Sequence, residues 1–306
     1  MIHQGDCLTI LRERFAPESV QCCVTSPPYW GLRDYGVEGQ LGLEATPELY
    51  VAKMVEVFRE VKRVLKADGT LWLNLGDSYA GSGRGNNPNG KQGTNKGTSF
   101  DPEYSGVVPS GLKHKDLVGI PWRVAFALQA DGWYLRQDII WAKPNPMPES
   151  VTDRCTKSHE YLFLLSKSER YYYDHEAIKE PATPGCHTTT QKSFGGQAAG
   201  AVVKPSGNQI PGSTFSWGET RNKRTVWTIA TQPYSEAHFA TFPPKLIEPC
   251  ILAGCPSGGL VLDPFAGSGT TIQVAQQLGR RGVGIELNPA YITLADTRTA
   301  QTGLAL

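Results

Sequence analysis

The chain has 306 residues and a formal net charge of +1 at neutral pH. This length is sufficient for one large α/β domain with an inserted or appended element. The small net charge neither indicates nor excludes a nucleic-acid partner, because a duplex meets one face of a protein and not its net charge.

Cysteine usage argues against a disulfide-rich or zinc-binding protein, and hydropathy argues against a membrane or secreted one. The seven cysteines contain no C-x-x-C pair and no cluster with the spacing of zinc ligands. No segment has the length of a membrane-spanning helix, and the N-terminus lacks a signal core. We therefore expect a soluble cytoplasmic protein in a reducing compartment, with no disulfide framework, no metal and no membrane partner.

The first predicted elements are a helix that follows Asp6 and a strand that ends before Pro27 and Pro28. Asp6 has the residue type of a helix N-cap, and a helix is predicted over 8–15. A buried strand follows over 20–24. Pro27 and Pro28 cannot continue that strand, because neither has an N–H to donate.

The segment Thr25-Ser26-Pro27-Pro28-Tyr29-Trp30 is therefore a rigid turn. Its prolines fix φ and leave the carbonyls of Ser26 and Pro27 without ladder partners, so that they can point into a cavity at the end of the strand. Taken alone, its central tetrapeptide Ser26-Pro27-Pro28-Tyr29 would be a rigid surface turn. Its interpretation depends on what else the chain carries.

The middle of the chain alternates helices and strands. An amphipathic helix is predicted over 47–65, with a strand over 70–75 after Asp68-Gly69. Residues 81–111 are rich in Gly, Asn, Ser and Lys and cannot build a core. The later predicted elements are a helix over 117–130 and strands over 132–141 and 160–165.

The last third contains a strand, a tight turn and a helix. A strand over 259–262 ends at Asp263, and a helix is predicted over 270–278 after a turn of small residues. Such a turn presents backbone N–H groups to a nucleotide-like ligand. The next strand, over 282–285, ends at Glu286, where an acid commonly binds ribose hydroxyls. Considered alone, Asp263 would be a helix cap and Glu286 a solvated residue at a strand end.

The turn D-P-F-A-G-S-G-T-T, residues 263–271, departs from the dinucleotide pattern G-x-G-x-x-G. It resembles the cofactor motif of S-adenosylmethionine-dependent DNA amino-methyltransferases, which methylate N4 of cytosine or N6 of adenine. The S-P-P-Y tetrapeptide and the segments W-x-K-P-N and H-E-Y-L-F also resemble that family. Because the catalytic motif precedes the cofactor motif, the order is the circularly permuted, beta-type one.

The resemblance implies a binding site for S-adenosyl-L-methionine. Asp263 would hold the amino-acid moiety, Phe265 would lie near the adenine, and Glu286 would bind the ribose. The adenine amine would donate to Asp6. Further residues expected around the cofactor are Phe242, Lys245, Gly267, Gly269 and Thr270.

The resemblance also gives the early turn a chemical role. An exocyclic amine is a poor nucleophile, because its lone pair is delocalised into the ring; acceptors at Ser26 and Pro27 would hold its N–H bonds and direct the lone pair at the methyl group. Pro28 completes the turn, and Tyr29 would stack on a flipped base. Serine at the first position is typical of N4-cytosine enzymes and aspartate of N6-adenine enzymes, although some adenine enzymes carry serine.

Basic residues indicate where DNA would bind. Residues 171–232 are irregular, and in the resembling family such a segment reads the DNA sequence. A solvated basic loop would have the same composition. Residues 81–111 are either a disordered loop or a lid that orders over DNA. The expected DNA contacts are Trp30, Lys143, Arg221, Lys223 and Arg224.

The predicted fold is a Rossmann-like, mostly parallel, doubly wound sheet with an inserted recognition region. Residues 1–170 would form the catalytic half, 171–232 the recognition region, and 233–306 the cofactor half. Double-stranded DNA is the expected partner. A homodimer and a cognate restriction endonuclease are left open, in a prokaryotic or phage-encoded system.

Other functions fit the sequence less well. Pro249-Cys250 resembles the nucleophile of enzymes that methylate carbon 5 of cytosine, but Cys250 lies in an apolar helix predicted over 244–252. RNA and protein-glutamine methyltransferases usually place the cofactor motif first. A DNA-binding module without catalysis would have one motif damaged, and a nicotinamide dehydrogenase requires a different glycine spacing.

Overall fold

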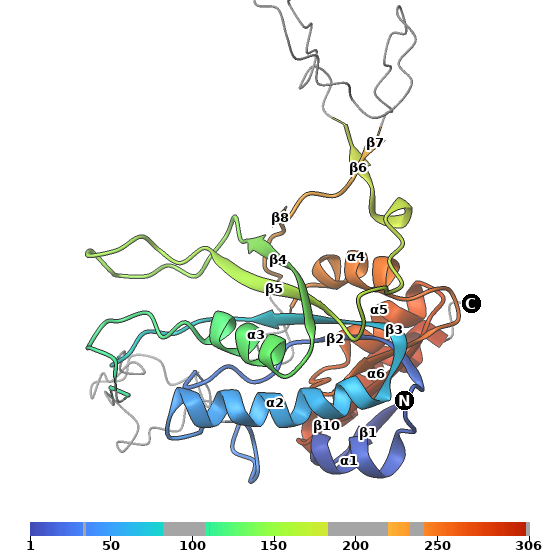
Figure 1. The fold of residues 1–306 in the computed structure, drawn as a ribbon, viewed down its shortest axis with the longest axis horizontal. Helices are drawn as coiled ribbons and strands as arrows, with labels where there is room; N and C mark the ends of the chain where they lie inside the picture. Colours follow the sequence, from blue (N-terminus) through green and yellow to red (C-terminus); the bar gives the residue numbers. More distant parts are fainter. Residues whose placement is uncertain (33–34, 82–107, 110, 183–219, 233–241, 304–306) are drawn as a thin grey trace, which may run out of the picture.

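The computed structural model describes residues 1–32, 35–81, 108–109, 111–182, 220–232 and 242–303. In these ranges an eight-stranded sheet carries helices on both faces (Figure 1). The helices are α1 (Cys7–Arg14), α2 (Pro47–Val64), α3 (Ile120–Ala130), α4 (Pro244–Gly254), α5 (Thr270–Gln277), α6 (Pro289–Gly303) and the 3₁₀ turn η1 (Glu176–Ile178). The strands are β1 (Ile2–Gln4), β2 (Val20–Thr25), β3 (Leu65–Leu75), β4 (Tyr134–Ala142), β5 (His159–Ser166), β6 (Glu180–Pro181), β7 (Thr220–Arg221), β8 (Val226–Thr228), β9 (Leu260–Asp263) and β10 (Arg281–Glu286).

The sheet is mostly parallel, as predicted. Its strand order is β1-β10-β9-β2-β3-β5-β4-β8, and the pairs from β1 to β3 are all parallel. Strand β5 runs antiparallel to both of its neighbours, β3 and β4, while β8 is parallel to β4. The late strands β9 and β10 lie between the early strands β1 and β2, so the permuted order of the two halves is a feature of the fold.

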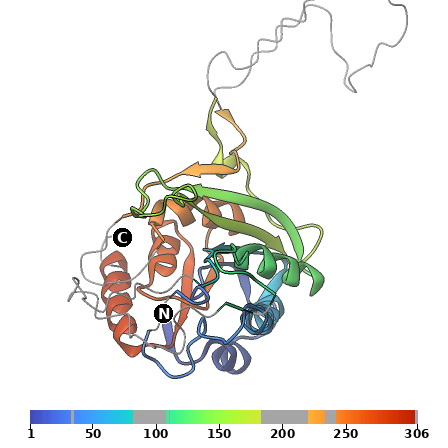
Figure 2. The same cartoon turned by 90° about the vertical axis from the view of Figure 1, so that its left-hand side faces the viewer.

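The helices form two layers around this sheet. Helices α1, α2 and α3 share one apolar core with the sheet, through side chains such as Leu11, Phe58 and Leu128. Helices α4 and α5 pack on the opposite face, through Ile247 and Val274 among others. Helix α6 contacts α5, β1 and β10. Figure 2 shows the first layer in blue to green and the second in orange to red.

Helix α2 illustrates how the local sequence directs this packing. The Thr46 hydroxyl accepts from the Leu49 N–H at 3.3 Å, and Pro47 occupies the first turn, where its missing N–H has no effect. The buried side chains follow a helical spacing and face β3; they are Tyr50, Met54, Val57, Phe58, Val61 and Val64.

Two predicted boundaries differ from the structure by three residues or more. Strand β3 begins at Leu65, directly after α2, and a register shift separates the Val20–Leu65 pair from the Cys22–Thr70 pair. Helix α3 begins at Ile120 and not at 117, because Gly119 takes a left-handed conformation (φ 79°) immediately before it.

The predicted recognition region, residues 171–232, is not wholly separate from the catalytic sheet. Strand β8 extends that sheet beside β4, whereas β6 and β7 pair in a ribbon of their own. Residues 183–219 lie outside the described residues, as does most of the segment 81–111. None of the described helices is long and apolar enough to cross a membrane.

Candidate active site

The two sequence motifs meet at the carboxyl ends of β2 and β9. These strands are neighbours in the sheet, with Cys23 paired to Leu262. Just beyond this pairing, the Thr25 hydroxyl donates to Oδ1 of Asp263 at 2.6 Å. The peptides that the sequence separates by more than 200 residues are therefore joined by a direct hydrogen bond.

Asp263 forms this junction and is not among the residues that line the cavity described below. Its side chain is buried, and its carboxylate accepts from the hydroxyls of Thr25 and Thr271, each at 2.6 Å, and from the Phe265 N–H at 3.0 Å. Burial raises the pKa of Asp263 to about 6, against the opposing effect of these three donors. In this structure the acid fixes the cofactor turn to β2; the direct cofactor contact expected for Asp263 stays a prediction.

A cavity opens beside this junction, at the ends of β9 and β10. Its wall includes four of the predicted cofactor residues, Asp6, Phe265, Gly267 and Glu286. Ser26 and Pro28 of the early turn line the same cavity. Residues of the cofactor motif and of the catalytic motif thus line the same cavity, as the sequence predicts.

Glu286 holds the turn while facing this cavity. Its Oε2 accepts from the Gly267 N–H and its Oε1 from the Asn288 N–H, both at 2.8 Å. Burial raises the pKa of Glu286 above its usual value. A carboxylate has about four lone-pair sites, so two backbone donors leave acceptor capacity for hydroxyl groups of a ligand.

Asp6 caps a helix, as predicted, and also lines the cavity, while its contact with a cofactor amine stays a prediction. Its Oδ1 accepts from the Thr9 N–H at 2.9 Å and caps α1, and its side chain lines the cavity. The strand before it, β1, pairs in parallel with β10, so that Gln4 lies beside Glu286. This pairing brings the N-terminus of the chain to the cofactor side of the site.

The other predicted cofactor residues lie away from the cavity wall. A Cβ on Gly269 would meet the Ala295 Cβ at 2.9 Å, so this glycine allows α6 to approach α5. Thr270 is buried in α5, Phe242 packs on the α4 side of the sheet, and Lys245 is exposed on α4.

A segment that the sequence analysis did not single out forms the outer wall of the cavity. Tyr35, Val37 and Leu41 line the cavity together with residues of the cofactor turn. The ends of this segment are closed by a hydrogen bond from the Gly31 N–H to the Gly42 carbonyl at 2.8 Å. The only sequence signal for such a compact loop is its repeated glycine.

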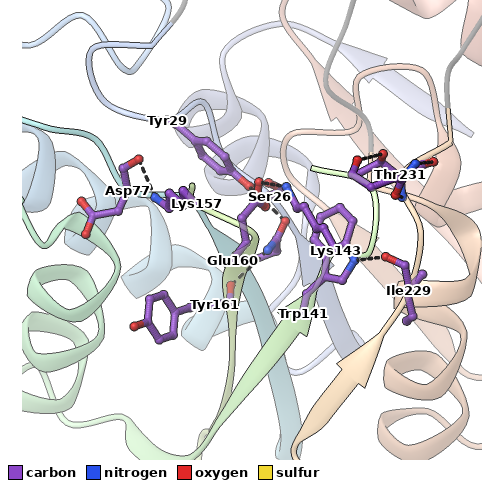
Figure 3. A network of polar contacts seen from close by, with 12 residues as sticks. Ser26, Tyr29, Asp77, Trp141, Lys143, Lys157, Glu160, Tyr161, Ile229 and Thr231 are labelled. Carbon is purple, nitrogen blue, oxygen red and sulfur yellow. Dashed lines mark hydrogen bonds and ion pairs between the residues drawn. The ribbon is translucent and has the colours of Figure 1, made fainter. Parts of the chain in front are cut away.

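Tyr29 is held by a polar network behind the early turn (Figure 3). Its hydroxyl donates to Oε2 of Glu160 at 2.7 Å, lies 3.0 Å from Oδ1 of Asn74, and accepts from the Ser26 hydroxyl at 3.3 Å. Burial, and then the Glu160 carboxylate, raise the pKa of Tyr29, so the phenol remains a proton donor. Pro27 is buried, and the Pro28 carbonyl accepts from the Tyr50 hydroxyl at 2.9 Å.

Glu160 is a central residue of this network that sequence reasoning missed, although the H-E-Y-L-F segment contains it. Its second oxygen forms an ion pair with Lys143. The Lys143 Nζ also lies 4.2 Å from the centre of the Trp141 ring. Lys143, predicted as a DNA contact, therefore belongs to the network that holds Tyr29.

The other predicted DNA contacts are engaged within the protein. The Trp30 indole N–H donates to the Glu44 carbonyl at 2.8 Å. Arg221 and Arg224 both donate to Oε1 of Glu180, at 2.8 and 2.5 Å. The Lys223 ammonium lies 4.9 Å from the centre of the Trp227 ring.

Two remaining expectations concern cysteine and metal chemistry. Cys250 is buried within α4, and burial raises the pKa of its thiol, which does not suit a nucleophile. Among the described residues, no group of His, Cys, Asp and Glu side chains could hold a metal ion.

Comparison with known proteins assigns the family. The family model for N6/N4 DNA methylases matches residues 20–297. The chain is 50% identical over 297 residues to the type II methyltransferase M.Cfr9I of Citrobacter freundii, which covers 97% of this chain and 86% of that protein. It is 52% identical over 281 residues to M.SmaI of Serratia marcescens, with coverages of 92% and 84%. The chain belongs to this family of S-adenosylmethionine-dependent DNA methyltransferases.

Solved structures share the fold. A PvuII DNA methyltransferase described as cytosine-N4-specific superposes with a TM-score of 0.64 at 20% identity, covering 97% of this chain and 85% of its own. A putative DNA modification methylase from Thermus thermophilus, complexed with S-adenosyl-L-methionine, gives 0.60 at 23% identity, with coverages of 98% and 93%.

Proposed function

We propose that this protein transfers a methyl group from S-adenosyl-L-methionine to N4 of a cytosine that is flipped out of double-stranded DNA. The observation that carries the proposal is the shared cavity, in which Ser26 of the early turn and Glu286 of the cofactor half line one space. A methyl donor and an acceptor base bound to these two motifs would lie side by side.

The cavity residues fit the donor in their chemistry. Glu286 offers acceptor oxygens to ribose hydroxyls, and Asp6 offers a carboxylate to an adenine amine. Phe265 and Leu41 supply apolar surface for a purine ring. Bound S-adenosylmethionine supplies a methyl group on a positively charged sulfur.

The early turn would act on the amine of the base. Acceptors at Ser26 and the Pro27 carbonyl hold its two N–H bonds and direct the nitrogen lone pair toward the methyl carbon. The new nitrogen–carbon bond would form as the carbon–sulfur bond breaks, with the electron pair of that bond left on a neutral thioether sulfur, and the nitrogen would then pass one proton to solvent. A target nitrogen held in place needs no covalent intermediate, which agrees with the buried state of Cys250.

The Tyr29 ring would provide the stacking surface for the flipped base, a contact of about 1–3 kcal/mol. Glu160 and Asn74 fix the ring through its hydroxyl, so its orientation exists before DNA binds. Such preorganisation lowers the entropic cost of capturing the base. Glu160 is thus a positioning residue in this proposal.

Cytosine is favoured over adenine on two grounds. Ser26 is the residue type typical of N4-cytosine enzymes, and the PvuII methyltransferase with the same fold is described as specific for cytosine N4. The alternative is N6 of adenine in the same pocket. RNA and protein-glutamine substrates are more remote alternatives.

The test is to incubate the protein with labelled S-adenosylmethionine and DNA of mixed sequence, digest the DNA to nucleosides, and identify the labelled base. We expect N4-methylcytosine. Label in N6-methyladenine would overturn the choice of base, and label only in RNA or protein would overturn the substrate class. A reaction without the protein serves as the negative control.

The names of the relatives extend this proposal to its partners. M.Cfr9I and M.SmaI are type II methyltransferases, so we propose that a restriction endonuclease of the same sequence specificity accompanies this protein. Methylated DNA would then resist that endonuclease in a protection assay.

Arg224, 67% exposed in its side chain despite its bond to Glu180, is the described basic residue best placed to exchange that carboxylate for a phosphate.

A further inference from the structure

Met147 is the most exposed of the large apolar side chains in the described part of the chain, with 84% of its surface accessible. It lies in the connection between β4 and β5. Single exposed apolar residues are common and need no explanation. Two further properties set Met147 apart: its segment is stiff, and it follows closely after Lys143, which belongs to the network that holds Tyr29.

The segment that carries Met147 has little conformational freedom. Prolines 144, 146 and 148 fix φ at three positions, and each residue before a proline is confined to extended conformations. Asn145 is fixed to Thr231 by its amide N–H at 3.1 Å, its side-chain carbonyl at 2.9 Å and its backbone carbonyl at 3.3 Å. Met147 is therefore presented to solvent on a rigid strut, defined here as residues 144–148.

Hydrogen bonds on the C-terminal side of Met147 restrict the segment further. Oε2 of Glu149 accepts from Arg154 at 2.6 Å and from the Lys157 N–H at 3.2 Å. The backbone N–H of Lys143 donates to the Ser158 carbonyl at 2.7 Å and closes the base of the loop. An apolar side chain on such a support loses little entropy when it enters a binding partner.

The strut begins directly after the network that holds Tyr29. Lys143, directly before it, forms the ion pair with Glu160, which in turn binds the Tyr29 hydroxyl. Four residues of extended chain span at most about 14 Å, so Met147 lies within that distance of Lys143. The loop extends from the sheet on the side where β2 and β3 end (Figure 1), and Figure 2 views that side directly.

We propose that Met147 is a wedge that enters the DNA base stack at the position vacated by the flipped base. This inference rests on the proposed function, because only an enzyme that extrudes a base leaves such a gap. A thioether side chain is unbranched and apolar and adapts to irregular spaces. Methionine is among the side chains that proteins insert between base steps. By filling the gap, Met147 would hinder the return of the base and prolong its residence against Tyr29.

The test uses two duplexes that contain the mapped methylation site. One carries the normal partner opposite the target base, and the other has an abasic position there, so that the target is already unpaired. Methylation is measured under single-turnover conditions for wild type, Met147→Ala and Met147→Leu. Leu49→Ala is the control, since Leu49 is 54% exposed on α2, outside the pocket.

We expect Met147→Ala to lower the rate on the paired duplex by about 10- to 100-fold, as loss of one apolar anchor would. On the abasic duplex its rate should return to within about threefold of wild type, because the target base there has no partner to which it would return. Met147→Leu retains the apolar volume and should remain close to wild type on both duplexes. Affinity for S-adenosylmethionine should not change in any variant.

Two results would overturn the wedge. An unchanged rate of Met147→Ala on the paired duplex would show that nothing needs to fill the gap. An equal loss on both duplexes would indicate a general structural or DNA-contact role. Failure of the wild type to methylate DNA at all would instead overturn the proposed function, and the wedge with it.

Discussion

At the scale of single residues, the Tyr29–Glu160 hydrogen bond connects the catalytic turn to β5. The Glu160 carboxylate lies between a phenol and an ammonium group, and its side chain is only 15% exposed. Loss of its charge leaves Lys143 without its counter-ion and Tyr29 without its strongest acceptor. Because a hydrogen bond to a charged group contributes about 1.5–3 kcal/mol, the effect on catalysis should be large.

We predict that Glu160→Gln lowers the methylation rate constant by about 10- to 100-fold, with little change in the affinity for S-adenosylmethionine. Tyr29→Phe removes the same hydrogen bond from the other side. In the double variant the two losses should be less than additive, because both variants weaken or remove the hydrogen bond between Tyr29 and Glu160. Single-turnover methylation with each variant provides the measurement.

Glu48→Gln is a matched control for this cycle. Glu48 pairs with Arg123 at 3.0 Å on the surface, where such pairs contribute about 0–1 kcal/mol. It should methylate DNA as the wild type does. Fully additive losses in the Glu160 and Tyr29 double variant would contradict the positioning role of Glu160.

The raised pKa of Asp263 predicts that the free energy of unfolding depends on pH. Its pKa is raised from 3.8 to about 6 in the folded protein, so the folded state binds the proton more tightly than the unfolded state. The contribution of this group to stability is therefore complete below pH 3.8 and is lost as the pH rises through about 6. The difference corresponds to about 3 kcal/mol.

Asp263→Asn removes this titration and leaves the shape of the side chain nearly unchanged. The unfolding free energy of wild type minus that of Asp263→Asn should fall by about 2–3 kcal/mol between pH 4 and pH 7, measured by denaturant titration at each pH. The subtraction cancels the other carboxylates. A difference that stays constant, or that increases with pH, would show that Asp263 keeps an ordinary or lowered pKa.

At the scale of elements, the carboxyl end of β3 is shaped to receive the Tyr29 ring. A Cβ at Gly76 would lie 2.5 Å from Cε2 of Tyr29, a distance that no packed pair of carbons adopts. The residue after β3 must therefore lack a side chain if the ring is to keep its place.

We predict that Gly76→Ala displaces the ring, lowering both the methylation rate and the free energy of unfolding, the latter by about 1–3 kcal/mol. In a Tyr29→Ala background the same substitution should have almost no effect on stability, because the ring that it meets is gone. Denaturant unfolding of the four proteins in this cycle is the measurement. Equal destabilisation in both backgrounds would place the strain elsewhere.

Most elements of the fold could be predicted from local patterns. The periodicity of α2, the apolar run of β2 and the strand–turn–helix unit around Asp263 each specify their own structure. The early onset of β3 could not be predicted, because Leu65 follows a helical pattern and becomes a strand only through its pairing with Val20. Tertiary pairing there outweighs local preference.

The candidate site was predicted less completely, for a related reason. Motifs show which residues gather at a strand end, and the cavity does bring Ser26 together with Glu286. They do not show which polar groups are occupied by partners within the protein. Asp263 binds Thr25, Arg221 binds Glu180, and Glu160 binds Tyr29, each across more than 40 residues of sequence. Such pairings follow from strand order and cannot be read from spacing.

At the scale of the whole molecule, the sheet does not depend on which half comes first. Strands β9 and β10 lie between β1 and β2, and the two halves are joined covalently only by the chain that runs through residues 233–241. Helix α6 follows β10 and contacts β1, so a connection from α6 to β1 would complete a β-α-β unit in the parallel sheet.

We predict that a circular permutant folds and methylates DNA. The native termini would be joined by a short Gly/Ser linker, and the chain would be opened within residues 233–241, which places the cofactor half first. All strand neighbours are preserved, so the melting temperature should fall by no more than about 10 °C, the effect of a changed loop closure. The measurements are thermal unfolding and incorporation of labelled methyl groups into DNA.

A second permutant with the same linker, opened between Val261 and Leu262, is the control. This opening interrupts β9, which pairs with both β2 and β10 and carries Asp263 to its bond with Thr25. It should fail to fold, because it divides a central strand whose ends must be held together. If the first permutant also failed, the covalent order of the halves would be needed for folding. If both succeeded, the Thr25–Asp263 junction would not be the structural centre that its burial and short hydrogen bonds indicate.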